Sequence, residues 1–186
     1  EEPLADVIRK VAERKGTTPE GVTVIMLDRE RHAEKVKEIR EVGARIRFIT
    51  DGDVSAALFA VTGSGAVDLL WGIGGTPEGV ISAAAIKCLG GRILGRLWPR
   101  DDRERDAAIA AGYDLDEILD QDRLVAGDNV FFAATGVTDG ELLQGVRYLS
   151  GGKASTESLI MRSRSGTVRT VRATHDRAKL REITGG

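Results

Sequence analysis

The chain has 186 residues, of which 41% are hydrophobic, and it carries 27 basic against 29 acidic side chains for a net charge of -2. This length and hydrophobic content predict a single domain with one sizeable core. The balanced charge excludes non-specific binding of nucleic acid, which needs a strong positive field. A local basic patch remains compatible with this charge.

The cysteine content and the N-terminus point to an intracellular protein. The one cysteine, Cys88, cannot form an internal disulfide and has no zinc-ligand spacing around it. The first residues, Glu1-Glu2-Pro3, lack the basic and apolar segments of a secretory signal. No apolar stretch is long enough to span a bilayer. We therefore expect a soluble, cytoplasmic protein without a membrane partner.

Strands and helices alternate along the first part of the chain. Leu4, Val7, Ile8 and Val11 share one helical face, and Gly16 ends that helix. Apolar runs of strand length predict strands at residues 22–27, 44–49, 67–71 and 93–97. Stretches of helical character predict helices at residues 32–42, 54–61, 77–89 and 101–111. This alternation predicts an α/β fold with a mixed sheet layered between helices.

The last third of the chain has a different pattern. It predicts a buried central strand at residues 130–134, a short helical turn at 141–146, an antiparallel hairpin at 157–173 and a final helix at 177–183. The hairpin is expected to close near Ser165-Gly166. Because no linker is visible, we expect this tail to add antiparallel strands to the same sheet rather than to form a second domain.

The first candidate site segment is Asp28-Arg29-Glu30-Arg31-His32, which follows a predicted strand. In open α/β sheets ligands bind beyond the carboxyl ends of the strands. Arg29 and Arg31 stand beside a helix N-terminus, where guanidinium and backbone donors can bind phosphate. The alternative is a solvated, charged helix start.

The second segment, Asp51-Gly52-Asp53, follows the next predicted strand. Its two carboxylates could accept hydrogen bonds from sugar hydroxyls or approach a metal. The alternative is a turn in which Asp53 caps the following helix.

The third segment, at residues 72–79, is rich in glycine and precedes a helix. Thr76 suits the N-cap and Pro77 the first helical position, while Gly75 and its neighbours let a ligand approach the backbone closely. Glu78 lies in the first turn, from which it could reach a metal. Pro77 excludes the dinucleotide fingerprint, and the Gly-Lys-[Ser/Thr] ending of a P-loop is absent. A plain strand-to-helix turn is the alternative.

Other polar residues have structural interpretations. Cys88 lies on an apolar helix and is predicted to be core. His32 is predicted at the surface of a helix start, and His175 just past the last strand. Neither histidine has a nucleophile placed near it. The segment at residues 127–136 is predicted to be a structural strand.

Together these segments resemble the C-terminal half of the class II fructose-1,6-bisphosphatases, a family that includes sedoheptulose-1,7-bisphosphatases. The resemblance runs along nearly the whole chain. It depends most on Asp51-Gly52-Asp53-Val54, on residues 72–79, and on Asp128-Asn129-Val130 followed by Ala134-Thr135-Gly136. Arg29 stands where some members have lysine, and Glu30 where proline is common.

The resemblance implies a role for each matching residue. Arg29 and Arg31 would contact substrate phosphate, Asp51 and Asp53 would hold sugar hydroxyls, and Gly75 would offer its backbone to the ligand. Glu78 would be a metal ligand, with Mn²⁺ or Mg²⁺ as cofactor. The implied fold is the C-terminal half of a sugar-phosphatase fold.

The resemblance also implies that this chain does not act alone. The N-terminal half of the family carries most of the metal-binding carboxylates, including an Asp-Pro-x-[Asp/Glu]-Gly-Thr motif, and no segment here matches it. We expect a homo-oligomeric, gluconeogenic enzyme that hydrolyses the 1-phosphate of fructose 1,6-bisphosphate, with this chain inactive by itself. The rivals are a sensor that binds sugar phosphates without hydrolysis and an assembly domain that uses Arg162 and Arg169. Fructose and sedoheptulose bisphosphates are not distinguished.

Overall fold

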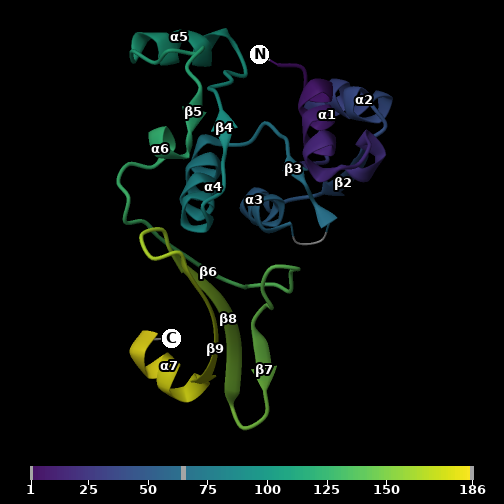
Figure 1. The fold of residues 1–186 in the computed structure, drawn as a ribbon. Coiled ribbons are helices and arrows are strands. Elements are labelled where there is room, and N and C mark those ends of the chain that lie inside the picture. The colour runs from purple at the N-terminus through teal and green to yellow at the C-terminus, as the bar shows by residue number, and fades with distance from the viewer. Residues whose placement is uncertain (1, 64–65, 185–186) are drawn as a thin grey trace. The chain divides into compact units, whose positions relative to one another are not determined.

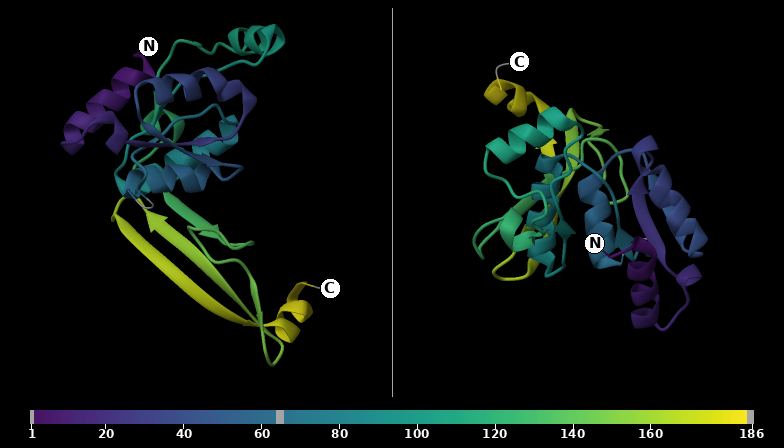
Figure 2. Two further views of the ribbon diagram at one scale, coloured as in Figure 1. Left: turned by 90° about the vertical axis from the view of Figure 1, so that its right-hand side faces the viewer. Right: turned by 90° about the horizontal axis from the view of Figure 1, so that it is seen from above.

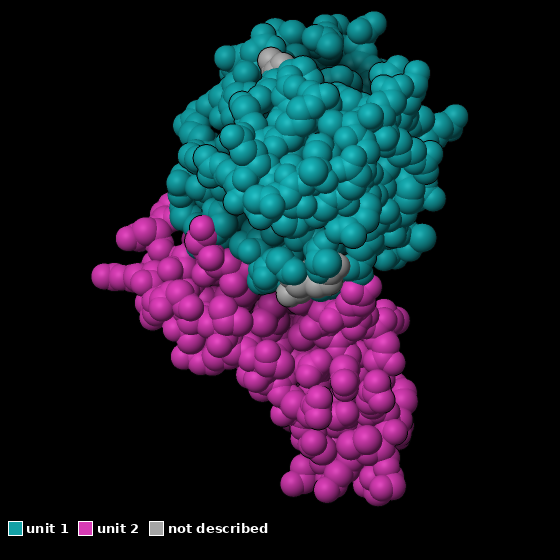
Figure 3. Space-filling view, turned by 45° about the vertical axis from the view of Figure 1, so that its right-hand side comes forward, with its two compact units in different colours: residues 1–87, 91–126 teal, residues 88–90, 127–186 magenta. Residues whose placement is uncertain are grey.

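A computed structural model describes residues 2–63 and 66–184 and divides the chain into two compact units. Unit 1 comprises residues 1–87 and 91–126, and unit 2 comprises residues 88–90 and 127–186 (Figure 3). Glu1, part of the N-terminal segment considered above, lies outside the described residues. The expectation of a single domain stays a prediction.

Unit 1 contains a three-stranded parallel sheet with the order β2-β1-β3 (Figure 1). Its strands are β1 (Thr23–Leu27), β2 (Arg45–Ile49) and β3 (Leu69–Leu70). The register places Val24 of β1 opposite Ile46 on one side and Leu69 on the other. Four of the five β1 residues are buried, because the central strand of a parallel sheet is covered on both faces.

Helices cover this sheet on both faces. Side chains on one face of β1 pack against α1 (Leu4–Lys15) and α2 (Ala33–Glu41) in a core cluster. That cluster contains Leu4, Ile8, Ala12, Val22, Val24, Met26, Ile39 and Ala44. The helix α3 (Asp53–Thr62) contacts β1 and β3, and side chains alternate between the two faces of a strand. The predicted α/β class with a sheet layered between helices is confirmed.

The end of α1 is set by Gly16, as the sequence predicts. Gly16 has a φ of 65°, in the left-handed region. Its N–H donates to the carbonyl of Glu13 at 3.0 Å, and the N–H of Thr17 donates to that of Ala12 at 3.0 Å. These bonds satisfy carbonyls that the last helical turn leaves without partners.

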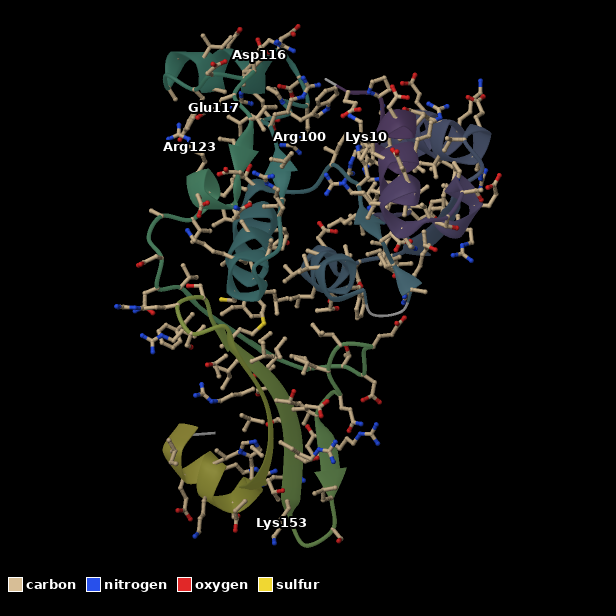
Figure 4. The ribbon with its side chains drawn as sticks, in the orientation of Figure 1. Lys10, Arg100, Asp116, Glu117, Arg123 and Lys153 are labelled. Carbon is tan, nitrogen blue, oxygen red and sulfur yellow. The ribbon has the colours of Figure 1, made fainter. Side chains whose placement is uncertain are left out.

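The remainder of unit 1 is built from short elements. They are η1 (Pro19–Gly21), η2 (Glu30–His32), most of α4 (Thr76–Leu89), β4 (Leu94–Gly95), α5 (Asp102–Ala110), β5 (Leu119–Asp120) and α6 (Gln121–Leu124). The strand predicted at 93–97 shrinks to β4, which pairs antiparallel with the unpredicted β5. Asp120 caps α6 by accepting from the N–H groups of Asp122 and Arg123. The side chain of Arg123 donates to Glu117 at 2.8 Å through Nε (Figure 4).

Unit 2 is a four-stranded antiparallel sheet centred on β8 (Lys153–Arg162). Its other strands are β6 (Phe131–Thr135), β7 (Arg147–Leu149) and β9 (Thr167–Asp176), and α7 (Arg177–Thr184) follows. The two long strands β8 and β9 run side by side, and β9 leads into α7 (Figure 2). They confirm the predicted antiparallel hairpin, with its turn at residues 163–166.

Three predictions about the strands of this tail were wrong. The strands of unit 2 pair with one another instead of joining the parallel sheet, within the described ranges. The strand predicted to be central is β6, but the central strand is β8. Among the described strands β6 has β8 as its one partner, and three of its five residues are exposed. His175 lies inside β9, opposite Ala154, and not beyond the strand. A local apolar pattern identifies a strand, but pairing partners decide its place in a sheet.

The segment at residues 136–146 is a tight loop and not the predicted helical turn. A Cβ added at Gly136 would lie 2.1 Å from the carbonyl oxygen of Gln144. A Cβ added at Gly145 would lie 2.5 Å from the carbonyl carbon of Thr138. Only glycine therefore allows the two sides of the loop to come so close.

Two further observations concern the helices. Cys88 is buried near the end of α4, and its thiol donates weakly to the carbonyl of Val130 at 3.6 Å, so the predicted core role is confirmed.

Across residues 2–63 and 66–184, no helix combines the length and apolar character that crossing a membrane requires.

Candidate functional site

Three loops of unit 1 meet at one edge of the parallel sheet. Since β1, β2 and β3 are parallel, their carboxyl ends point to the same edge. The loops that leave this edge begin at Asp28, Thr50 and Trp71. All six residues predicted from the sequence to bind substrate or metal lie in these loops or in the helical turns that follow them.

The two arginines connect the first loop to the other two. Arg29 donates from Nη2 to the carbonyl of Thr50 at 2.7 Å and from Nη1 to that of Asp28 at 2.9 Å. Arg31 donates from Nε to the carbonyl of Ile73 at 3.1 Å and from Nη2 to the same oxygen. Both side chains are exposed. The fixed guanidinium forks are therefore held by backbone oxygens and keep further N–H donors for an anion.

The second loop brings one of its two carboxylates to the glycine-rich segment. The Oδ2 atom of Asp53 would lie 2.9 Å from a Cβ added at Gly74. Asp51 is exposed in the preceding turn. The capping alternative for Asp53 was wrong, because Gly52, with a φ of 92°, occupies the N-cap position of α3 without a side-chain cap.

The third loop places a carboxylate directly over its own glycine. The N–H of Gly79 donates to the carbonyl of Gly75 at 3.0 Å, so the first helical turn of α4 begins one residue earlier than the predicted cap at Thr76. The side chain of Glu78 folds back, and its Oε2 would lie 2.2 Å from a Cβ added at Gly75. Any side chain at position 75 would therefore collide with this carboxylate.

His32 is a site residue that the sequence analysis missed. It was predicted at the surface, but it is fully buried. Its Nδ1 lies 2.9 Å from the carbonyl of Leu27, and its Nε2 accepts from the N–H of Ile73 at 3.1 Å. The only signal in the sequence was its place next to Arg31, since its contacts with Trp71 and Ile73 come from a segment about forty residues further along the chain.

The arrangement offers both signs of charge to a polar ligand. Two arginines border the edge, and Asp53 and Glu78 stand at the glycine-rich loop, where they could accept hydrogen bonds from hydroxyl groups. Carboxylate oxygens also suit a hard divalent cation. Over the described part of the chain, no three His, Cys, Asp or Glu side chains form a group that could hold a metal ion. Glu78 could thus supply one ligand, with others needed from elsewhere.

The segment at residues 127–136 belongs to unit 2. Arg162 donates from Nε to Oδ1 of Asn129 at 2.8 Å and lies over the ring of Phe131. Ser163 donates to the carbonyl of Asp128 at 2.7 Å and accepts from the N–H of Val130 at 2.7 Å. The Asp128–Val130 stretch is therefore fastened to the end of β8, which agrees with the structural role predicted for it.

Comparisons with known proteins identify a family whose model matches most of the chain. A family model described as bacterial fructose-1,6-bisphosphatase, glpX-encoded, matches residues 1–175. The chain is 44% identical over 167 residues to a D-fructose 1,6-bisphosphatase class 2/sedoheptulose 1,7-bisphosphatase of Synechococcus sp. strain JA-2-3B'a(2-13), covering 83% of this chain and 48% of that protein. It is 39% identical over 186 residues to a fructose-1,6-bisphosphatase class 2 of Haemophilus influenzae, covering 93% of this chain and 56% of that protein.

The chain spans about half the length of the curated relatives it matches. The solved structure of the sugar N-methyltransferase KedS8 from a Streptoalloteichus species aligns with this chain at 15% sequence identity and a TM-score of 0.22. The alignment covers 94% of this chain and 71% of the methyltransferase chain, and a TM-score this low bears on neither fold nor function.

Proposed function

Since this chain belongs to the family of the bacterial class II fructose-1,6-bisphosphatases, we propose that it supplies the sugar-phosphate-binding half of such an enzyme. The complete enzyme would hydrolyse the 1-phosphate of fructose 1,6-bisphosphate in gluconeogenesis and glycerol metabolism. The observation that carries this proposal is that Arg31, Asp53 and Glu78 lie against one glycine-rich loop. Arg29 connects the two loops beside it through the carbonyl of Thr50.

Each residue would have a distinct part in binding. Arg29 and Arg31 would pair with the phosphate that is not cleaved, because a planar guanidinium matches phosphate oxygens. Asp51 and Asp53 would accept hydrogen bonds from the sugar hydroxyls, and Gly75 would let the ligand approach the backbone. Together they would fix the sugar so that the 1-phosphate reaches the catalytic centre, which contributes through proximity and orientation.

Glu78 would provide one oxygen ligand to a divalent metal, Mn²⁺ or Mg²⁺. When bound, the metal would supply an activated water and neutralise charge on the transferring phosphoryl group. The other carboxylates would come from an N-terminal half, which we propose is a partner of this chain in a cytoplasmic homo-oligomer. One glutamate cannot hold the metal alone, so this chain by itself should be inactive.

A sugar-phosphate sensor is the second candidate. It is favoured by the finding that Glu78 is not accompanied, among the residues described, by two further potential metal ligands. Such a sensor would bind the sugar phosphate through the same loops without cleaving it.

Binding and hydrolysis by this chain test the proposal. We expect calorimetric binding of fructose 1,6-bisphosphate and no phosphate release with either Mn²⁺ or Mg²⁺. Arg29→Ala should raise the Kd about tenfold or more, through loss of charge-assisted hydrogen bonds. Arg103→Ala, on the exposed face of α5, should leave the Kd unchanged.

The outcomes separate the candidates. Turnover by this chain would show that the catalytic groups lie within it and would refute the half-enzyme proposal. Absence of any binding would refute both the half-enzyme and the sensor. Binding without turnover leaves the two to be separated in the complete enzyme, where Glu78→Gln should abolish hydrolysis only if the half-enzyme proposal is right.

A further inference from the structure

His32 and Arg31 hold both polar backbone groups of one residue in the glycine-rich loop. The N–H of Ile73 donates to Nε2 of His32 at 3.1 Å, and the carbonyl of Ile73 accepts from Nε and Nη2 of Arg31. The loop after β3 is therefore tied at Ile73 to two consecutive residues that follow β1. We call these contacts the Ile73 clamp.

The clamp specifies the protonation of the imidazole. The carbonyl of Leu27, 2.9 Å from Nδ1, can only accept, so Nδ1 must carry the proton. The N–H of Ile73 can only donate, so Nε2 must be unprotonated. His32 is thus assigned from its hydrogen bonds as the neutral Nδ1–H tautomer.

Packing around the ring keeps it in this orientation. His32 is fully buried, and its ring meets that of Trp71 edge to face, with centroids 5.3 Å apart and planes at 78°. Its Cε1 atom would lie 3.8 Å from a Cβ added at Gly72. The imidazole therefore fills the space beneath the start of the loop, and a ring flip would break both of its hydrogen bonds.

We propose that His32 is a positioning residue that sets the conformation of residues 72–75 before any ligand arrives. It acts through Ile73 on the backbone of Gly74 and Gly75, and it does so only as the neutral Nδ1–H tautomer. The statement that this loop receives a sugar phosphate rests on the proposed function, whereas the clamp itself rests on the contacts of His32.

The tautomer can be tested on the unmodified protein. Long-range ¹⁵N–¹H correlation spectra distinguish a protonated from a bare ring nitrogen. We expect the His32 ring to show a protonated Nδ1 and an unprotonated Nε2. A ring protonated on Nε2, or on both nitrogens, at neutral pH would overturn the proposal without the need for any variant.

Two variants separate the two hydrogen bonds of the ring. The amide of His32→Asn can take the place of Nδ1 and donate to Leu27, but it cannot reach Ile73. The longer side chain of His32→Gln can place its oxygen near the position of Nε2 and accept from Ile73. We expect the amide hydrogen of Ile73 to exchange at least about tenfold faster in His32→Asn and to be largely protected again in His32→Gln.

Ligand affinity gives the second readout. The Kd for fructose 1,6-bisphosphate should rise about tenfold in His32→Asn and less in His32→Gln, at equal melting temperatures. Equal exchange rates in both variants, or an equal Kd in His32→Asn and the unmodified protein, would overturn the proposal. If the unmodified protein binds no sugar phosphate, the proposed function fails, while the exchange data still decide the clamp.

Discussion

Replacing Gly75 by alanine is the sharpest test of the role of Glu78. The new Cβ would lie 2.2 Å from Oε2 and 3.2 Å from Cδ of Glu78, whereas ordinary contact begins at 3.4 Å. The carboxylate oxygen must therefore move away by about 1.2 Å. Gly75 has no positive φ, so the backbone itself tolerates alanine.

The size of this displacement decides the expected effect. Metal–oxygen distances tolerate changes of only about 0.2 Å, so a carboxylate moved by about 1.2 Å would no longer sit at a ligand position. Because Glu78 is exposed and flexible, it can rotate away at little cost in stability. We expect Gly75→Ala to lower metal-dependent phosphate release by about 10–100-fold, with the free energy of unfolding changed by less than about 0.5 kcal/mol.

The assay is phosphate release from fructose 1,6-bisphosphate by the complete enzyme over a range of Mn²⁺ concentrations. Gly79→Ala is the matched control, because a Cβ there meets nothing within 4 Å. It should keep full activity and raise the free energy of unfolding by about 0.5–1 kcal/mol, the usual gain for alanine over glycine in a helix. Full activity of Gly75→Ala with an unchanged Mn²⁺ dependence would refute the assignment of Glu78 to the metal.

Three further predictions concern stability. Gly16→Ala should lower the free energy of unfolding by about 1 kcal/mol in urea titrations, because the φ of 65° is strained for alanine while the space is open; no loss would contradict the cap. Ile39→Ala, at a fully buried core position, should cost about 2–5 kcal/mol by the same method, and a cost below about 1 kcal/mol would show a loosely packed core. The hydrogen bond from Lys35 holds the pKa of Glu38 below its ordinary 4.5, so the stability it adds is present above that value and lost as pH falls through the lowered pKa. The free energy of unfolding, measured from about pH 7 to 3, should therefore fall less steeply with acid in Glu38→Gln than in the unmodified protein. Identical pH profiles of the two proteins would show that Glu38 adds no such stability.

Local patterns in the sequence were enough to place most elements of unit 1. The apolar face of residues 4–11 and the glycine at position 16 predicted α1 and its end, because helix periodicity and left-handed caps are local properties. The apolar run at residues 22–27 predicted β1 for the same reason. Short strands such as β4 and β5 were predicted poorly or missed, since two residues carry no periodicity.

The sequence also predicted that Arg29, Arg31, Asp53 and Glu78 would follow strand ends. Whether they meet depended on strand order, and the parallel arrangement β2-β1-β3 puts their loops at one edge. The roles of these residues in binding and of Glu78 in holding a metal stay predictions. The arrangement of their loops at one edge of the sheet is the part that the tertiary structure added.

The residues and strands that were misplaced share one physical cause. β6 had the composition of a buried strand, but it pairs with β8 in a sheet that does not include the parallel strands, and three of its five residues are exposed. His32 stood in a charged segment, yet Trp71 and Ile73 bury it. Periodicity, helix caps and the residue types at strand ends could be predicted from the sequence, because they depend on neighbouring residues. Strand partners and the burial of His32 could not be predicted in this way, because they depend on atoms brought together by contacts between separate segments.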